Sequence, residues 1–482
     1  MTAQTLPNKI LIKGKNNSVS SRGVYCCFFS LFILSVIVMI VILLDFDKPN
    51  HYSLLFLLPL SYICLLIITA QRFKSLLINF GTILIILLEF IKLVLSPLFL
   101  TLSGYVEVIH LNVEQNTSAA ILLLAYEAIA IAVAFIVPSK KRRISQTSSK
   151  SYRNGIKKLH VVMIMYTVML AIMCLISPDI LLSHRTFLGV FTDKTFTHMT
   201  LDSVVNNFAG SEFQRYVLML SRFFLLPYRL LLPAYLIFCI KYYKFKHGKF
   251  WSFVVSFTPL LFVSDVIAQS IYFTLFLLFL TIYLYHISYK VTLFVFVTGV
   301  CMVGIYFVGR FFVTATDDSN FVSDMSRRLI AYFSGLNITS GVFNQPTNFD
   351  NKVQYFLYDF LTAIPFNKTL LGLDQSISTA TLFNYANSVS GQIPTTIGMG
   401  FYYFGPVFSP IYSFVLAFVA KRFGEKLRAE TIPLYYIIYL YMLFILALGI
   451  CMYNIEIAFN TIVQAILPIF IIAKICFKRK KS

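Results

Sequence analysis

The sequence predicts an all-α, polytopic membrane protein of about twelve transmembrane helices, folded as one integral membrane domain over residues 1–482. Apolar runs of about 18 residues or more recur along the chain, and a run of this length can cross a bilayer as a helix. Hydrophobic residues make up 58% of the sequence and charged residues 12%, whereas about a quarter of the residues in soluble domains are charged. The net charge of +20 comes mainly from lysines and arginines in the turns between the runs, which argues against nucleic acid as a partner.

The apolar runs define the expected helices in chain order. The first follows a basic leader, is too long for the core of a signal peptide and precedes no small-residue cleavage site, so we expect it to remain as a membrane helix. Only Ser264 and Asp265 provide a turn between the seventh and the eighth. The twelve expected spans are about residues 24–44, 52–70, 76–102, 118–137, 159–177, 217–240, 251–267, 269–287, 291–309, 396–420, 432–453 and 457–476.

The distribution of basic residues predicts the topology. Turns on the side of the N-terminus hold 27 lysines and arginines, whereas the opposite side holds nine in much longer loops. The positive-inside rule then makes both termini cytoplasmic. Two outer loops are long, residues 178–215 and residues 310–394. Because a loop of such length is usually functional or disordered, we look for activity in the second one.

Two segments of the second long loop have helical periodicity. In the first, the apolar residues Phe321, Met325, Leu329, Tyr332 and Leu336 are spaced by close to 3.6 residues. The second has one apolar face and ends before Pro365, and its face comprises Val353, Phe356, Leu357, Phe360, Leu361 and Ile364. Such a helix can lie in the membrane interface or cover a cavity, but simple packing of the apolar face onto the bundle is the more common arrangement.

Arginines in the sixth span and the second long loop form the most distinctive charged pattern. Arg215, Arg222 and Arg229 follow one another at seven-residue intervals, which places them near one face of a helix. An arginine inside a membrane normally faces a cavity and has a partner, and its planar fork suits phosphate. Arg310, Arg327 and Arg328 add basic residues on the same outer side. The simpler alternative is that Arg215 lies at the interface, that Arg229 snorkels and that Arg328 pairs with Asp324.

The layout and one motif resemble a known family. The segment that follows the second long loop reads GQIPTTIGMGFYYFGP, in which a proline precedes a glycine, an aromatic residue and an FG pair. The residues that carry the resemblance are Pro394, Gly398, Phe401, Tyr402, Phe404 and Gly405. Together with about twelve spans and one long outer loop, they make the chain similar to the Wzy-type O-antigen (oligosaccharide repeat unit) polymerases. Some members carry arginine-x10-glycine motifs, whereas no arginine in this chain has a glycine eleven residues later.

The resemblance implies a GT-C-like glycosyltransferase of the bacterial inner membrane. Its substrates would be glycans linked to undecaprenyl diphosphate, joined at the periplasmic face into O-antigen or a related surface polysaccharide. No metal, nucleotide or other cofactor would be required, because the donor is already activated. Arg222 and Arg310 would stabilise the diphosphate leaving group. The substrate-binding residues would be Arg215, Arg229, Arg327, Arg328, His184, Arg185 and Tyr402.

A general base for the attacking hydroxyl would be a carboxylate or histidine on the outer side. Asp317 and Asp324 are the expected catalytic carboxylates, although spacing does not distinguish them from His184, Asp318, Asp359 and Asp374. Inside the spans, Glu89 and Lys92 are three residues apart and are expected to neutralise each other, whereas Glu127 has no evident partner.

Other functions remain open. An O-antigen ligase shares the architecture, but a histidine in the large outer loop would favour it and residues 310–394 contain none. A lipid-linked oligosaccharide flippase or another transporter would have short loops and two related halves, whereas the halves of this chain differ in loop length. A structural partner of a polysaccharide chain-length regulator is a third, non-enzymatic possibility. The chain has no Walker A, GxSxG or HExxH motif, so an ATP-driven pump or a metalloprotease has no support.

Overall fold

The computed structural model confirms the all-α prediction for the part of the chain that it describes. It describes residues 21–77, 79–105, 115–138, 149–177, 211–218, scattered positions between 220 and 235, 321–333, 335–344, 352–364, 371–372, 378–389, 392–430 and 432–477. Every regular element within these ranges is a helix. The predicted spans at about 251–267, 269–287 and 291–309 lie outside them, as do most of the sixth span and most of the first long loop.

Six helical stretches among the described residues are long and apolar enough to cross a membrane, and a bent pair of helices can count as a seventh. The six stretches are Asn50–Arg72, Phe80–Leu102, Thr117–Ile136, Asn154–Ile176, Leu434–Cys451 and Ile455–Cys476. They agree within a few residues with the predicted second to fifth, eleventh and twelfth spans. The first predicted span is the helix α1 (Ser21–Leu44), whose apolar part, Phe28–Leu44, is shorter. The total of twelve spans stays a prediction.

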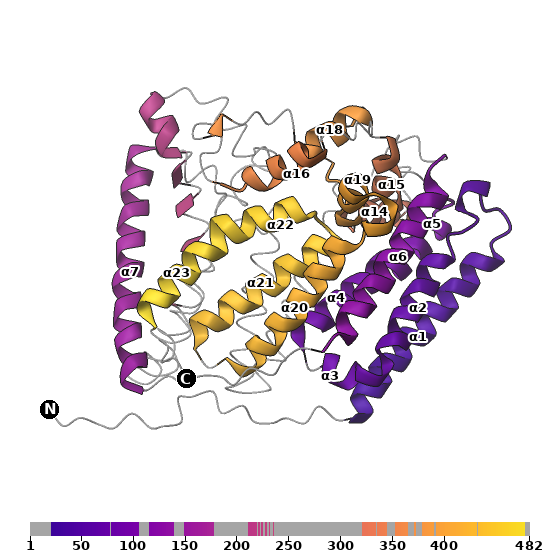
Figure 1. Cartoon of the computed structure of the whole chain (residues 1–482), viewed down its shortest axis with the longest axis horizontal. Coiled ribbons are helices and arrows are strands. Elements are labelled where there is room, and N and C mark those ends of the chain that lie inside the picture. Colours follow the sequence, from indigo (N-terminus) through magenta and orange to yellow (C-terminus); the bar gives the residue numbers. More distant parts are fainter. Residues whose placement is uncertain are drawn as a thin grey trace.

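Some of the six stretches combine several consecutive helices, and the helices of the bundle include two π-helices. Their bounds are η2 (Asn50–Tyr52), α2 (Leu57–Thr69), η3 (Ala70–Arg72), α3 (Phe73–Leu77), α4 (Phe80–Phe90), the π-helix η4 (Ile91–Leu95), α5 (Ser96–Leu102), α6 (Thr117–Ile136), α7 (Ser149–Ile176), α20 (Ile411–Ala429), α21 (Pro433–Cys451), α22 (Ile455–Thr461), the π-helix η10 (Ile462–Ile466) and α23 (Leu467–Cys476). Helix α20 packs against both α21 and α6, while α2 packs against α1 and α6. Helix α7 lies at the far end of the bundle and contacts α23 (Figure 1).

The inner and the outer surfaces of the bundle are both apolar. Leu65, Ile85 and Ala128 are fully buried between helices, whereas Leu34 of α1 and Met165 of α7 are exposed. Large exposed apolar surfaces are rare on soluble monomers and typical of contact with a membrane. The exposed faces of α1 and α7 therefore support the membrane assignment.

Basic residues of the predicted cytoplasmic turns cap the C-terminus of α6. The Lys421 ammonium donates to the carbonyl oxygens of Phe135, at 2.7 Å, and Val137, at 2.5 Å, and Arg72 donates to that of Ile136. The last carbonyl groups of a helix have no partner within the helix and carry partial negative charge. These cations therefore stabilise the end of α6, in addition to their expected effect on the orientation of the protein in the membrane.

The predicted tenth span, 396–420, is not one straight helix. Helix α19 (Thr396–Phe408) and α20 meet at an angle of 107°, so the chain forms a broken span or a re-entrant loop. Gly405 has φ of +75°, which L-residues other than glycine rarely adopt, and prolines follow at positions 406 and 410. Gly405 and Pro406 therefore kink α19 internally, and Pro410 lies at the break between α19 and α20.

Both predicted helices of the second long loop are present. The first is α14 (Phe321–Tyr332), followed by α15 (Leu336–Gly341) and η7 (Val342–Asn344), and the second is α16 (Lys352–Leu361). Helix α18 (Thr379–Ala386) lies later in the same loop. Helix α14 contacts α5, α15 contacts α6, and α16 contacts α18, α19 and α22. Figure 1 shows α16 and α18 together across one end of the bundle, next to α22 and α19.

Candidate active site

Helix α16 buries charged residues, and only part of its predicted apolar face packs onto the bundle, through Phe356 and Phe360. Leu357 is 52% exposed, and Leu361 and Ile364 are exposed as well. On the inner side, by contrast, Asp359 is only 2% exposed, and Lys352 is also buried. In a membrane or at its interface the surroundings are apolar, so an amphipathic helix can turn its apolar face outward and its polar face inward. The arrangement brings charged groups into the protein interior.

Asp359 is held by two neighbouring elements. Its Oδ1 accepts from the backbone N–H of Thr379 at 3.0 Å, and its Oδ2 accepts from the hydroxyl of Tyr403. The hydroxyl groups of Thr379 and Tyr403 also share a hydrogen bond. Thr379 is the first residue of α18, whose N-cap is Ser378, and Tyr403 belongs to the bent helix α19. The carboxyl group therefore lies where a loop helix, a second loop helix and the broken span meet.

Burial raises the pKa of the Asp359 carboxyl group above its ordinary value, and the hydrogen bonds from Thr379 and Tyr403 lower it in part. A carboxylate with a raised pKa is a stronger base than an ordinary aspartate. Perturbed carboxyl groups of this type are candidates for functional residues, with structural networks as the alternative. Asp359 thus has the environment of a general base.

Aromatic rings surround this carboxyl group. Phe356 of α16 lies edge-on to Tyr403, with ring centroids 5.6 Å apart, and is stacked with Tyr412 of α20 at 6.5 Å. Phe360 packs edge-on against Phe459 of α22 at 4.9 Å. Aromatic side chains provide large apolar faces that suit the faces of sugar rings or a lipid chain while excluding water.

A second carboxyl group belongs to the same region. Glu456 lies in the first turn of α22, and its Oε1 is 3.5 Å from the hydroxyl oxygen of Thr362. That hydroxyl also donates to the backbone carbonyl of Asp359 at 2.7 Å. Thr362 therefore lies between Glu456 and the backbone of Asp359, and no direct hydrogen bond joins the two carboxyl groups in the described part of the chain. We define Asp359, Thr362, Thr379, Tyr403 and Glu456 as the outer carboxyl cluster.

Lys352 and Tyr402 border this cluster. The Lys352 ammonium lies 5.6 Å from the centre of the Tyr402 ring, and the rings of Tyr355 and Tyr402 are 6.4 Å apart. Burial lowers the pKa of Lys352. A lysine in such a position can supply positive charge beside Tyr402, where an anionic group of a substrate could bind.

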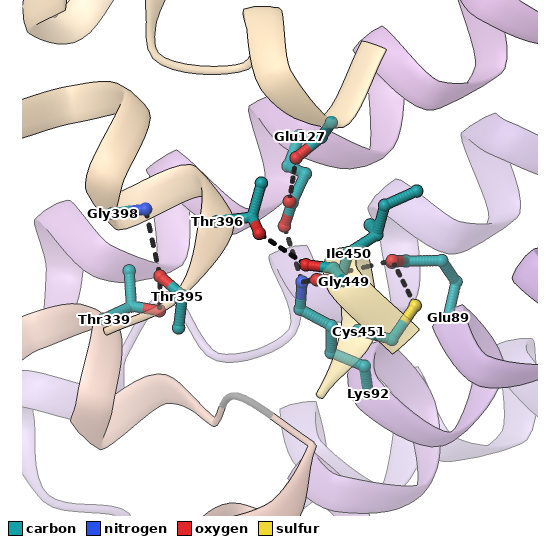
Figure 2. A network of polar contacts seen from close by, with 11 residues as sticks. Glu89, Lys92, Glu127, Thr339, Thr395, Thr396, Gly398, Gly449, Ile450 and Cys451 are labelled. Atoms are coloured by element: carbon teal, nitrogen blue, oxygen red, sulfur yellow. Dashed lines mark hydrogen bonds and ion pairs between the residues drawn. The ribbon is translucent and has the colours of Figure 1, made fainter. Parts of the chain in front are cut away.

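A different polar cluster lies deeper, between the spans. Figure 2 shows Glu89, Lys92 and Glu127 converging near the end of α21. The Lys92 ammonium is 2.6 Å from Glu127 Oε2 and 4.0 Å from Glu89 Oε1. The expected pair of Glu89 and Lys92 is thus present at ion-pair distance, but Glu127, which was not expected as a partner, lies closer to the ammonium. Glu127 also accepts from Ser413, so this glutamate, unexplained by sequence, has a clear structural role.

The predicted site residues are only partly within the described chain. Arg215 is exposed on a short helical segment, Arg327 is exposed on α14, and Tyr402 is buried on α19. Among the described side chains, no hydrogen bond or ion pair joins these three residues. Asp324 and Arg328 lie on α14, but their side chains lie outside the described part, so their expected ion pair stays a prediction. The residues that lie entirely outside it are His184, Arg185, Arg222, Arg229, Arg310 and Asp317.

Sequence reasoning gave no preference to Asp359 and did not consider Tyr403 or Glu456. Asp359 was one of six equivalent candidates, because spacing along the chain does not report which carboxyl group is buried. The sequence nevertheless placed Tyr403 close to the predicted site, because it directly follows Tyr402, a predicted substrate-binding residue, in the FYYFGP segment. No family model, no curated protein and no solved structure matches this chain.

Proposed function

We propose that this protein is a glycosyltransferase that polymerises oligosaccharide repeat units linked to undecaprenyl diphosphate, at the periplasmic face of a bacterial inner membrane. The observation that supports it best is Asp359, a buried carboxyl group on a helix of the second long loop, bonded to a tyrosine of the bent span. In this proposal the outer carboxyl cluster lies near the membrane surface, where a lipid-linked donor and a sugar hydroxyl could meet. The apolar outer face of α16 would contact the lipid.

Asp359 acts as the general base in the proposed reaction. The hydroxyl group of the acceptor sugar transfers its proton to the Asp359 carboxylate and attacks the anomeric carbon of the donor. A new glycosidic bond forms as the bond between that carbon and the diphosphate oxygen breaks, and undecaprenyl diphosphate leaves with the electron pair. The hydrogen bonds from Tyr403 and Thr379 hold the carboxylate in one orientation.

Positive charge is needed where negative charge develops on the diphosphate. Arg222 and Arg310 are proposed for this role, with Arg215, Arg229, Arg327 and Arg328 as further contacts of the lipid diphosphate. Lys352, next to Tyr402, is an additional candidate from the described part of the chain. The chemistry needs no nucleotide sugar, because the diphosphate linkage already activates the donor.

A reconstitution experiment tests the proposal. Purified protein is mixed with lipid-linked single repeat units, without nucleotide sugar, and the products are separated on a gel. A ladder of chain lengths is the expected result, and Arg222→Ala or Asp359→Asn should reduce it to single units. In cells that lack their own polymerase, Arg222→Ala should leave lipopolysaccharide capped with only one repeat. A complete ladder from the Arg222→Ala variant would remove this arginine from the mechanism.

Transport of lipid-linked oligosaccharides is a second candidate, and one feature favours it. The 107° bend between α19 and α20 produces a discontinuous span, which is common around the binding sites of transporters. The same preparation in vesicles distinguishes the two functions. Movement of lipid-linked units across the bilayer without a ladder would support transport and refute polymerisation.

A further inference from the structure

Three ionisable side chains in the middle of the bundle have no part in the proposed reaction. Glu89 is 0% exposed, Lys92 is 3% exposed and Glu127 is 1% exposed. They come from α4, η4 and α6, near the middle of two spans, Phe80–Leu102 and Thr117–Ile136. Charged residues inside a membrane are costly and usually mark a function or a tightly matched set of partners. Lys92 also lies within a π-helix, a feature that is frequent at functional sites.

Glu127 has all the contacts that an ionised carboxylate needs. Its Oε2 is 2.6 Å from the Lys92 ammonium, and its Oε1 accepts from the Ser413 hydroxyl of α20. The Lys92 ammonium uses a second donor on the backbone carbonyl of Ile450, at 3.3 Å. Lys92 and Glu127 therefore form a neutral pair that also caps the C-terminal end of α21.

Glu89 lacks such contacts. Among the described residues, its Oε1 accepts a hydrogen bond only from the Cys451 thiol, at 3.2 Å; the Lys92 ammonium, 4.0 Å away, is at ion-pair distance but too far for a hydrogen bond. Its Oε2 is buried and has no hydrogen-bond partner among the described residues. A buried carboxylate without partners costs far more than the neutral acid. Two carboxyl groups and one lysine leave the cluster one positive charge short of neutrality.

We propose that Glu89, Lys92 and Glu127 form an intramembrane proton-binding site, in which one proton resides on Glu89 while Lys92 and Glu127 remain ionised. The bound proton makes Glu89 a carboxylic acid and brings the net charge of the cluster to zero. The titratable groups that face Glu89 are Lys92, Glu127 and Cys451, from η4, α6 and α21.

The site is connected to the bent span through consecutive carbonyl groups. The Thr396 hydroxyl, at the start of α19, donates to the carbonyl of Gly449, and Lys92 donates to the next carbonyl, that of Ile450 (Figure 2). Removal of the proton would place two negative charges around one lysine and draw Lys92 toward Glu89. The proton therefore maintains the contact between Lys92, the end of α21 and the start of α19.

Infrared spectroscopy of the purified full-length protein tests this inference. The carbonyl stretch of a protonated carboxylic acid is separate from the carboxylate bands and shifts on exchange into heavy water. The wild type at neutral pH should contain one more such carbonyl than Glu89→Gln. Because glutamine resembles the neutral acid in shape and charge, Glu89→Gln should unfold at the same temperature as the wild type.

Two variants of the cluster sharpen the test. In Glu127→Gln, Lys92 loses its close partner and pairs with Glu89, so the acid band should disappear as it does in Glu89→Gln. In Lys92→Met, both glutamates should become protonated, and the band should double. The exposed Glu425 of α20 provides the control, since Glu425→Gln should leave the acid band unchanged.

Identical acid bands in the wild type and in Glu89→Gln would overturn the proposal. Loss of the carboxylic acid band of the wild type on exchange of a large organic cation for sodium in the buffer would also overturn the proposal. Glu89 would then hold a metal cation in place of a proton. If Lys92→Met or Glu127→Gln fails to fold, the comparison between the wild type and Glu89→Gln still decides the question.

Discussion

Replacement of Asp359 by asparagine separates the chemistry of the outer carboxyl cluster from its packing, because the two side chains have nearly the same shape. Asparagine Oδ1 can still accept from the backbone N–H of Thr379. Its NH2 group can donate to the Tyr403 oxygen if the tyrosine hydroxyl turns its own proton toward Thr379, with which it already shares a hydrogen bond. The proton-accepting carboxylate is lost, whereas each polar atom keeps a partner.

The expected effects of Asp359→Asn on stability and on reaction rate differ in magnitude. A charge-assisted hydrogen bond becomes a neutral one, which costs about 1 kcal/mol, but removal of a buried charge offsets this loss, so the free energy of unfolding should change little. Loss of a general base typically reduces the rate about 10²- to 10⁴-fold. We therefore expect Asp359→Asn to fold, with its polymerisation rate reduced by at least about 100-fold.

The assay measures the rate of ladder formation from lipid-linked repeat units together with the thermal unfolding of the same preparation in detergent. Asp47→Asn is the matched control, since Asp47 is an exposed aspartate near the end of α1. Tyr403→Phe removes one hydrogen-bond donor to Asp359 and should reduce the rate less than Asp359→Asn, because the carboxylate itself remains. A folded Asp359→Asn protein with the wild-type rate would refute the role of Asp359 as general base.

The remaining predictions concern stability. Burial raises the pKa of Asp359 in the folded protein, so the contribution of this group to folding stability is fully present below the ordinary aspartate pKa and is lost as pH rises through the raised value. The free energy of unfolding should therefore fall over this pH window. A pH series of urea titrations should show a smaller fall for Asp359→Asn. Lys421→Met leaves carbonyl groups of α6 unpaired and should destabilise the protein by about 1–3 kcal/mol, whereas the same replacement of the exposed Lys474 should have little effect in thermal melts. Gly400→Ala would place a Cβ atom 1.9 Å from the Ser409 carbonyl oxygen at the bend, and denaturant unfolding should show a loss of about 1–3 kcal/mol; wild-type stability would contradict this close approach.

The apolar spans and the helices of the second long loop were predictable because each depends on residues that are close in the chain. Length and hydropathy identify a span, and a period near 3.6 identifies an amphipathic helix such as 353–364. The kink at Gly405 and the bend between α19 and α20 were not predicted, because the continuous hydropathy from 396 to 420 indicated a single span despite the glycine and the two prolines. The inward side of α16 was predicted only in part. Phe356 and Phe360 pack inward as expected, whereas Leu357 and Leu361 are exposed, since the rule that apolar residues face inward holds in water and not beside lipid.

The ion-pair partners of charged residues were predictable only when both residues lie close together in the sequence. The helical rule proposes Glu89 for Lys92, three residues away, whereas the closer partner, Glu127, is 35 residues away on another helix. Asp359 likewise became distinct from the other aspartates only through Thr379 and Tyr403, which reach it from α18 and α19.

By itself, the sequence determined that this is a helical membrane protein, where the described spans begin and end within a few residues, and which loop segments are helices. Hydropathy and helical period are properties of consecutive residues, so they can be determined from the sequence alone. Only the tertiary structure decided which carboxyl groups are buried, which cation neutralises which anion and where the bent span meets the loop helices. Burial and ionic pairing depend on distances between helices far apart in the chain, and these distances are set by the packing of the whole bundle.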